Sequence, residues 1–576
     1  MSPETKTCQN CKTSFTIEPD DFSFYEKIKV PPPTFCPECR LIRRLSFRNE
    51  KSLYRNQCQK CGQSVISVYP KDSCIVVYCR PCWWGDSWDG ADYGRDFDES
   101  KPFITQFKEL LYSTPLPSLF GIYTTLVNSE YANMVTALKN CYMITHSDFS
   151  ENCLYGSVID ICKDSVDNLI LTDSELCYET VDCQKCYHAM YSVDCDNCHD
   201  VYFSRNCIGC SDCLGCVNLK NKKYCIWNEQ YSKEEYKEKI KELKLDSHTS
   251  IQSIMSQAKD FWNKFPQKYM HERHNADVSG DYVYNSKNTH DSFIVSDMED
   301  SRFCAYVTHG VKTTNCYDFT HYGIASDLMY ESLQTGNHAS RIRFCWYTVL
   351  NTSDMEYSVS STGCKDCFGC VGLKKKEYCI LNKQYTKEEY FTLRDKIVNH
   401  MNSMPYVDKR GLVYKYGEFF PSELSPFGYN ATTAQEFFPL TKDEIQKEGF
   451  NWKETEDRSY SIDILPDNLE DTMENIDEQI LNKIIGCEHS GSCSDNCSVA
   501  FKLTPEEFQF YKKLNIPVPH LCPNCRHSTR TKFRNPMKLW HRKCMKDGCQ
   551  NEFETSYSPD RPEIVYCEKC YQQEVV

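Results

Sequence analysis

The chain has 576 residues and a net charge of −15, with 40% hydrophobic and 13% aromatic residues. It is longer than one compact domain usually is, and its apolar content excludes wholesale disorder. Residues 1–10 lack a basic segment followed by an apolar core, and no stretch approaches the roughly 20 apolar residues that cross a bilayer. The sequence therefore predicts a soluble protein without a signal peptide.

Cysteine is unusually frequent, with 38 copies. Many of these cysteines form Cys-x-x-Cys pairs, in which two thiolates of one tight turn can share a tetrahedral metal ion. Secreted disulfide scaffolds, by contrast, are usually short chains. We therefore expect a cytoplasmic protein with metal-bound and buried free thiols rather than an oxidised scaffold.

The first predicted unit, residues 1–98, contains four cysteine pairs, and residues 481–576 contain a second copy of it. Each interval between successive pairs has the same length in both copies, and both contain Cys-Pro-x-Cys-Arg followed by Phe-Arg-Asn. Because both the intervals and the sequence motifs agree, the two units are interpreted as a duplication. The predicted ligands are Cys8, Cys11, Cys36, Cys39, Cys58, Cys61, Cys79 and Cys82 in the first copy, and Cys493, Cys497, Cys522, Cys525, Cys544, Cys549, Cys567 and Cys570 in the second.

Eight paired thiolates in each copy are enough for two zinc sites with four sulfur ligands each. Such a site has no position left for water, so these zinc ions would be structural. The apparent binding free energy of structural zinc is roughly 10–16 kcal/mol, so modules this small should fold only with metal. We predict four zinc ions, with the first knuckle paired with the second and the third with the fourth. Cys74 and Cys487 have no counterpart and are left unassigned.

The segment from Cys8-Gln-Asn-Cys11 through Phe22-x-Phe-Tyr25 to Cys36-Pro-Glu-Cys39-Arg40 resembles the bacterial "probable zinc-ribbon" family of treble-clef type. The segment from Cys493 to Arg526 resembles it too, with one extra residue in its first knuckle. The whole chain also resembles large Cys-rich bacterial proteins that carry this module at both termini. The resemblance covers about 35 residues at each end, and it implies a zinc fold without implying an activity.

A treble clef would start a helix at the Cys-Pro-x-Cys-Arg knuckle, and strongly basic segments follow it at residues 40–60 and 526–546. Guanidinium groups bind phosphate and aromatic rings stack on bases, which favours contact with nucleic acid or a ribonucleoprotein. Docking on the acidic middle of the same chain, a protein partner, or simple solvation are the alternative interpretations. The candidate nucleic-acid contacts are Arg40, Arg43, Arg44, Arg48, Arg55, Arg526, Arg530, Lys532, Arg534, Trp540 and Arg542.

Residues 99–245 and 246–400 are predicted to form two blocks of a β-solenoid with about 12 residues per rung. Small or apolar residues recur at this interval, as expected for the inward-facing ladder of short stacked strands. The columns of the first block are Cys141, Cys153, Ser165, Cys177, Ala189, Val201, Cys213 and Cys225, then Cys162, Ser174, Cys186, Cys198 and Cys210, then Cys183, Cys195 and Cys207; the looser second block has Cys304, Cys316 and Leu328, then Met355, Cys367 and Cys379.

Each block should end in a charged capping helix, because the capping boxes Ser232-x-x-Glu235 and Thr386-x-x-Glu389 follow the last rungs. Residues 401–480 are predicted to form an aromatic-rich strap, with a third capping box at Thr441, and then an acidic flexible linker over residues 454–477. The predicted fold class is α+β, mainly β, with a central Cys-rich solenoid flanked by duplicated treble-clef modules.

The middle cysteines have three possible roles: a core ladder, a disulfide ladder, or a metal or iron–sulfur cluster at Cys207-x-x-Cys210-x-x-Cys213-x-x-Cys216. The sequence contains no His-Glu-x-x-His, Gly-rich phosphate loop or nucleophile elbow. We therefore expect a non-catalytic zinc scaffold whose basic ends contact nucleic acid or a ribonucleoprotein. The alternatives are a protein–protein adaptor using the acidic solenoid face, a redox protein, or a carbohydrate-active protein using Asp297, Glu299 or Asp300.

Overall fold

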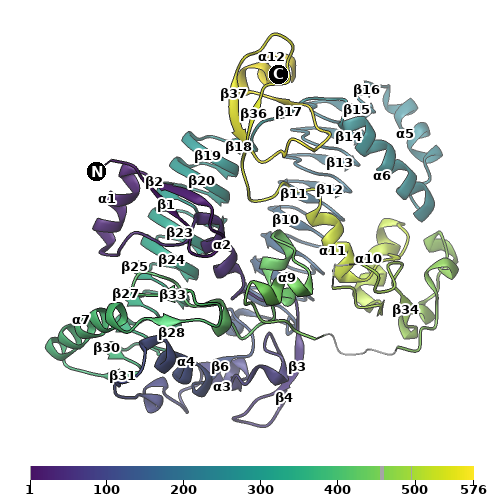
Figure 1. The fold of residues 1–576 in the computed structure, drawn as a ribbon. Coiled ribbons are helices and arrows are strands. Elements are labelled where there is room, and N and C mark those ends of the chain that lie inside the picture. The colour runs from purple at the N-terminus through teal and green to yellow at the C-terminus, as the bar shows by residue number, and fades with distance from the viewer. Residues whose placement is uncertain (1, 455–459, 494–495, 576) are drawn as a thin grey trace.

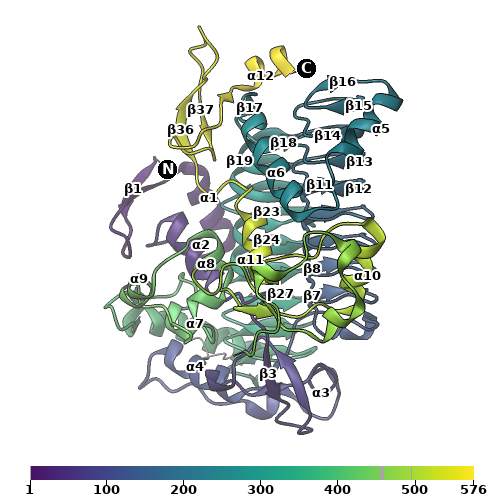
Figure 2. The same ribbon diagram turned by 90° about the vertical axis from the view of Figure 1, so that its right-hand side faces the viewer.

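A computed structural model describes residues 2–454, 460–493 and 496–575. The chain is mainly β, as predicted, and consists of two stacks of short parallel strands that lie side by side (Figures 1 and 2). The two terminal modules pack on the outside of these stacks (Figure 1). Among the described residues, no helix is both long and apolar enough to cross a bilayer.

The first stack comprises residues 127–230, and its strands form two sheets, β7 to β11 and β12 to β16, in which each strand pairs with the next along the chain, in parallel except for the last pair. Val201 pairs with Cys213, and Cys213 pairs with Cys225, so the register advances by one predicted rung per strand. The strands are β7 (Asn133–Thr136), β8 (Thr145–Asp148), β9 (Ser157–Asp160), β10 (Leu169–Thr172), β11 (Val181–Gln184), β12 (Tyr187–Met190), β13 (His199–Tyr202), β14 (Ser211–Leu214), β15 (Lys223–Ile226) and the antiparallel β16 (Glu229–Gln230).

Each 12-residue repeat of the first stack is built from four triplets. The columns predicted from the sequence follow only the 12-residue period and not this shorter period of three. The middle residue of successive triplets has a positive φ, as at Asn197 (52°), Asp200 (52°) and Asn206 (52°). Asn and Asp adopt this left-handed conformation more readily than most residues, which explains their position before the column residues. The third residue of each triplet points into the core, so Cys207 and Cys210 are fully buried.

The second stack, residues 272–384, has the same triplet pattern with irregular repeat lengths. Asp327 pairs with Ser340 and Ser353 pairs with Lys365, so the first of these rungs is one residue longer than the second. Its strands are β18 (Glu272–Arg273), β19 (Ala276–Tyr284), β20 (Lys287–Ser296), β21 (Met298–Arg302), β22 (Ala305–Val307), β23 (Thr313–Gly323), β24 (Asp327–Gly336), β25 (Ser340–Arg343), β26 (Trp346–Val349), β27 (Ser353–Glu356), β28 (Val359–Thr362), β29 (Lys365–Phe368), β30 (Glu377–Ile380) and the antiparallel β31 (Lys383–Gln384).

Because the repeat lengths are irregular, the predicted column Cys304, Cys316 and Leu328 is wrong. Cys316 pairs with Met329 rather than aligning with Leu328. Ala305 pairs with Thr320, so the rung that follows Cys304 is longer than the regular repeat. The cause is a longer connection before β23. The later column is confirmed, because Met355 pairs with Cys367 and Cys367 with Cys379.

Capped helices follow both stacks, as predicted. In α5 (Lys233–Glu242) and α7 (Lys387–Ser403) the capping Ser232 and Thr386 accept from the third helical N–H, and the Glu side chain accepts in return. The helix α6 (His248–Trp262) then packs its buried face along the side of the first stack, against a cluster that runs from Leu169 to Ile226. The third capping box, at Thr441, starts α9 (Lys442–Lys447). Each capping box satisfies backbone N–H groups at the start of its helix.

The predicted strap is ordered and includes β32 (Tyr406–Val407), β33 (Val413–Tyr414) and α8 (Thr433–Phe437). Of the predicted flexible linker, residues 455–459 lie outside the described residues. The rest is not a free linker, because Asp471 accepts from the Thr249 N–H at 2.8 Å and Met473 is buried. The acidic composition suggested disorder, but helix capping and a few apolar side chains anchor this segment.

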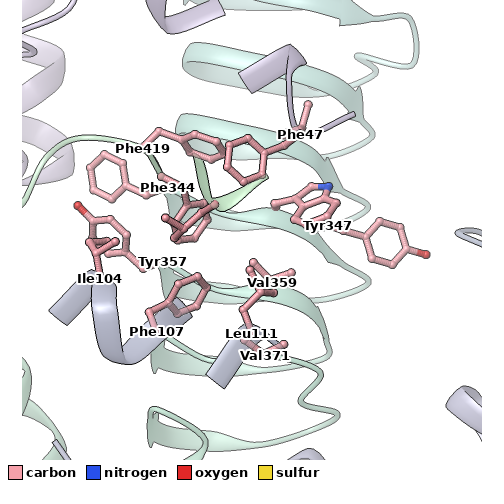
Figure 3. Packing of buried hydrophobic residues seen from close by; sticks show 14 of the residues in the cluster. Phe47, Ile104, Phe107, Leu111, Phe344, Tyr347, Tyr357, Val359, Val371 and Phe419 are labelled. Atoms are coloured by element: carbon pink, nitrogen blue, oxygen red, sulfur yellow. The ribbon is translucent and has the colours of Figure 1, made fainter. Parts of the chain in front are cut away.

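An apolar cluster joins the N-terminal module to the second stack (Figure 3). Phe47 packs edge-on against Phe419 of the strap, with ring centroids 5.4 Å apart. On the other side of the cluster, Phe107 of α4 (Phe103–Ser113) stacks on Phe420 at 4.8 Å. The module, strap and stack therefore share one core.

Candidate metal centres

Each terminal module consists of two small hairpin-and-helix units. In the N-terminal module they are β1 (Glu4–Thr7), β2 (Ser14–Ile17), α1 (Pro19–Ile28) and α2 (Pro37–Leu45), then β3 (Tyr54–Gln57), β4 (Ser64–Ser67), β5 (Val77–Tyr78) and α3 (Arg80–Trp84). In the C-terminal module they are β34 (Ile485–Gly486), β35 (Ala500–Phe501), α10 (Pro505–Leu514) and α11 (Pro523–Thr531), then β36 (Trp540–Lys543), β37 (Glu552–Thr555), β38 (Val565–Tyr566) and α12 (Glu568–Val575).

Cysteine thiols converge in these units, and the sulfur atoms of each group lie within 4.8 Å of one another. The first knuckle groups with the second and the third with the fourth, which is the predicted pairing. The groups are Cys8, Cys11, Cys36 and Cys39; Cys58, Cys61, Cys79 and Cys82; Cys487, Cys497, Cys522 and Cys525; and Cys544, Cys549, Cys567 and Cys570.

The sulfur–sulfur distances fit a shared tetrahedral ion. Cys11 and Cys36 are 3.7 Å apart, and Cys61 and Cys79 are 3.9 Å apart. A tetrahedron with zinc–sulfur bonds of about 2.3 Å has edges of about 3.8 Å. The same distances are far too long for a disulfide bond of about 2.05 Å. Each group can therefore hold one metal ion with no coordination position left for water.

Backbone N–H groups donate to one sulfur of each thiol group, and these hydrogen bonds identify equivalent cysteines in the different groups. The N–H of Cys36 donates to Cys8 Sγ at 3.2 Å, and the N–H of Cys79 donates to Cys58 Sγ at 3.2 Å. Such donors favour the thiolate form, and despite burial, backbone N–H groups lower the pKa of Cys58 to about 6. In the C-terminal module the equivalent donation runs from the Cys522 N–H to Cys487 Sγ at 3.3 Å.

Cys487 therefore takes the place that sequence spacing assigned to Cys493. Gly486 pairs with Ala500 as Thr7 pairs with Ser14, which aligns Cys487 with Cys8. The first C-terminal knuckle is thus Cys487-x9-Cys497, seven residues longer than Cys8-x2-Cys11. Spacing favoured Cys493 because it lies closer to Cys497, and only the strand pairing reveals the insertion.

The arginines predicted to bind nucleic acid are mostly buried. Arg40, Arg43, Arg44 and Arg48 are at most 2% exposed, and Arg526, Arg530 and Arg534 at most 7%. Arg55 and Lys532 are exposed, and Trp540 and Arg542 are half-buried. A phosphate backbone could not reach the buried guanidinium groups in this fold, so the predicted nucleic-acid surface is wrong for these seven residues. Six of them pair with carboxylates of the acidic middle, which was the alternative interpretation, and Arg48 pairs with Glu50 of its own module.

In the N-terminal module the arginines of α2 contact the second stack. Arg40 pairs with Asp318 at 2.8 Å, and Arg44 contacts Asp318 and Glu331, each at 3.1 Å. Arg43 joins Glu331 at 2.9 Å to Glu418 of the strap at 3.1 Å. All of these side chains are at most 5% exposed, so each charge depends on its partners.

In the C-terminal module the arginines of α11 contact the first stack in the same way. Arg526 and Arg530 both pair with Asp167, at 2.9 and 3.0 Å, and Arg530 also pairs with Glu179 at 2.9 Å. Asp167 and Glu179 have positive φ, as do Asp318 and Glu331, so all four are middle residues of triplets. The sequence carried no signal for these carboxylates, because many similar triplet positions are acidic.

The second unit of each module attaches to the other stack. In the N-terminal module, β5 pairs in parallel with β6 (Leu116–Pro117), which leads into the first stack. In the C-terminal module, β38 pairs in parallel with β17 (Gln267–Lys268), which leads into the second stack. Each terminal module therefore spans both stacks.

The middle cysteines form a buried ladder. Cys207 and Cys213 each lie near the backbone carbonyl two residues earlier, with sulfur–oxygen distances of 3.6 and 3.4 Å. Burial raises the pKa of Cys162 to about 12, which favours the neutral thiol there. Small neutral side chains of this kind fill the core of a narrow stack, as the ladder interpretation expects.

A cavity of about 590 Å³ lies between the two stacks beside the C-terminal module. Its lining includes Asp182, Asp194 and Asp297, the last being a candidate for carbohydrate chemistry. Asp182 is engaged by Arg534 at 2.8 Å, and Arg205 approaches Asp194 at 3.8 Å. Asp196, Glu272 and Glu568 also line the cavity and pair with Arg273 or Lys268. Five of the six lining carboxylates thus have cationic partners, so no pair of free carboxylates emerges among the described residues.

Comparison of the sequence with protein-family models produced no match. A search of curated proteins produced no significant match either. The metal-site geometry and the arginine contacts are therefore the basis of the functional assignment.

Proposed function

We propose that this protein is a non-catalytic, zinc-stabilised scaffold in which two terminal modules clamp two β-solenoids together. Zinc is the metal that best suits four closed thiolate sites, because it prefers tetrahedral sulfur coordination and has no redox chemistry. The 12-residue and 13-residue parallel registers support the solenoid interpretation of both stacks. The four thiol groups then correspond to four structural zinc ions.

The observation that carries this proposal is that each module reaches both stacks. A metal site fixes the start of α2 at Cys36 and the start of α11 at Cys522. Residues 40 and 44 of α2, and 526 and 530 of α11, then lie on one face of their helices, since they are four residues apart. Zinc therefore orients the guanidinium groups toward the buried carboxylates, and the rest of the module attaches to the other stack.

The modules also meet each other. Glu436 of α8 accepts from Lys51 at 3.1 Å and lies 3.2 Å from His527, so one carboxylate joins the two ends. Lys51 and His527 hold the pKa of Glu436 far below its usual range in spite of its burial. The scaffold is closed by contacts between its two metal-binding ends.

Metal analysis combined with hydrogen exchange tests this function. The purified chain should contain at least four zinc equivalents, and a strong chelator should increase amide exchange in β23, β24, β10 and β11, which carry or adjoin the clamped carboxylates. Fewer than four equivalents, or unchanged exchange in these strands after complete zinc removal, would contradict the proposal.

A further inference from the structure

The lengthened first knuckle of the C-terminal module brings two additional metal-binding side chains to its zinc site. The N-terminal counterpart has only Gln9 and Asn10 between its cysteines, whereas the segment between Cys487 and Cys497 contains His489 and Cys493. Neither of these belongs to the group Cys487, Cys497, Cys522 and Cys525.

Cys525 is shared between this group and the additional side chains. Its sulfur lies 3.8 Å from Cys487 Sγ and 3.6 Å from Cys493 Sγ. Both values are close to the tetrahedral edge of about 3.8 Å expected for zinc–thiolate coordination. A ring nitrogen of His489 lies within 4.8 Å of both the Cys493 and the Cys525 sulfur. His489 Nδ1 is buried and has no hydrogen-bond partner among the described residues.

We propose that this knuckle binds two metal ions, the second held by His489, Cys493 and a bridging thiolate of Cys525. A thiolate can bridge because sulfur has more than one lone pair available. Two soft sulfurs and an imidazole favour zinc, cobalt or cadmium over calcium or magnesium. This inference rests on occupancy of the neighbouring four-thiol site, which the proposed function supplies.

The second ion differs from the four structural ions in its coordination. It has three protein ligands and one open position, whereas the four-thiol groups are closed. Cys493 and His489 are half-buried, so solvent can reach this side of the site. The second ion is therefore held more weakly and exchanges first.

Metal stoichiometry of the full-length protein tests the inference. We expect five zinc equivalents in the wild type, and a weak chelator should remove one of them before the rest. Cys493→Ser and His489→Gln should each bind four equivalents. The control is Cys74→Ser, which removes an exposed thiol outside the four groups and should retain five equivalents.

Several outcomes would overturn the inference. Four equivalents in both the wild type and Cys493→Ser would show that only the four-thiol ions bind. Three equivalents in Cys493→Ser, against four in the wild type, would make Cys493 a ligand of a single ion. Fewer than four in the wild type would contradict the proposed function itself.

Cadmium NMR of the wild-type chain gives a second measurement that does not depend on a folded variant. Cadmium bound by four thiolates resonates at a different frequency from cadmium bound by two thiolates and an imidazole. We expect one resonance of the mixed type besides those of four-thiolate sites. Resonances of the four-thiolate type alone would overturn the inference.

Discussion

The N-terminal and C-terminal modules, here called the two clamps, are copies of one module. Both use arginines to contact a stack, but the additional carboxylates that complete the contact differ. In both, two arginines four residues apart share one aspartate of a stack: Arg40 and Arg44 share Asp318, and Arg526 and Arg530 share Asp167. The N-terminal clamp adds Arg43 and the strap residue Glu418. The C-terminal clamp has Thr529 at that position and is completed by Glu507 of its own module.

The comparison shows which features the geometry requires. The four-thiol sites and the shared aspartates occur on both sides, because together they place a charged helix on a stack of parallel strands. The knuckle length, the use of the strap and the repeat length of the stack differ between the two sides, so the shared contact does not require them. The second stack even tolerates 13-residue repeats next to the clamp.

Breaking either clamp at its metal should have the largest effect. Because each first-knuckle site orients arginines toward a different stack, Cys36→Ser should loosen the second stack and Cys522→Ser the first. Each loses much of an apparent binding free energy of roughly 10–16 kcal/mol. Hydrogen exchange resolved by peptide would detect this, with Cys74→Ser as the control. Equal loosening of both stacks by either variant would contradict separate clamps.

Removing a shared aspartate tests whether the two clamps are energetically equivalent. Asp318→Asn and Asp167→Asn each leave two buried arginines without a full counter-charge, so each should lower the free energy of unfolding by about 3–5 kcal/mol. Urea titration measures this quantity. The exposed Asp173 is a matched control at another positive-φ position, and Asp173→Asn should change it by less than about 0.5 kcal/mol. A difference between the clamps above the experimental error would show that Glu418 and Glu507 are not equivalent.

Histidines between the stacks should make the contact pH-dependent. Burial lowers the pKa of His309, but Asp160, 3.1 Å away, together with Asp148 and Asp297 raises it to about 9. The folded pKa exceeds the unfolded value of about 6.5, so this pair stabilises the fold fully below pH 6.5 and its contribution is lost as pH rises to 9. His309→Gln should remove roughly 3 kcal/mol of this dependence, since one pKa unit corresponds to about 1.4 kcal/mol.

Thermal unfolding of the His309→Gln variant at several pH values between 6 and 9.5 measures the effect. The control is His199→Gln, at an exposed position of β13, which should keep the wild-type pH profile. An unchanged profile in His309→Gln would show that another group controls this pH range.

The smallest expected effect is that of substitutions at the positive-φ position of a triplet, made once in each stack. Lys185 and Lys375 are exposed and have φ values of 49° and 50° in the first and second stack. Asn adopts this left-handed conformation more easily than Lys, so Lys185→Asn and Lys375→Asn should each raise the free energy of unfolding by about 0.5–1 kcal/mol. The control Lys163→Asn lies at the first position of a triplet and should give no increase. A gain in only one stack would show that the triplets are not equivalent.

Local sequence was enough to predict the duplicated modules, the pairing of their knuckles, the mainly β stacks and the helix caps. These depend on residues close together in the chain or on a fixed repeat, so spacing is sufficient to identify them. The third residue of each triplet, for example, must be small or apolar because it points into a narrow core. The shorter period of three was present in the sequence as well, since Asn, Asp and Gly recur before the column residues.

The partners of the arginines were settled by the packing of the modules in three dimensions, and the cysteine that completes the third thiol group by a strand pairing within its module. Basic charge in a helix has the same sequence pattern whether it faces phosphate, solvent or a buried carboxylate, and Asp318 lies 278 residues from Arg40. Cys487 entered the site through the pairing of Gly486 with Ala500, although Cys493 lies nearer in the chain. Partners distant in sequence are chosen by how the modules pack, and local spacing contains no information about that packing.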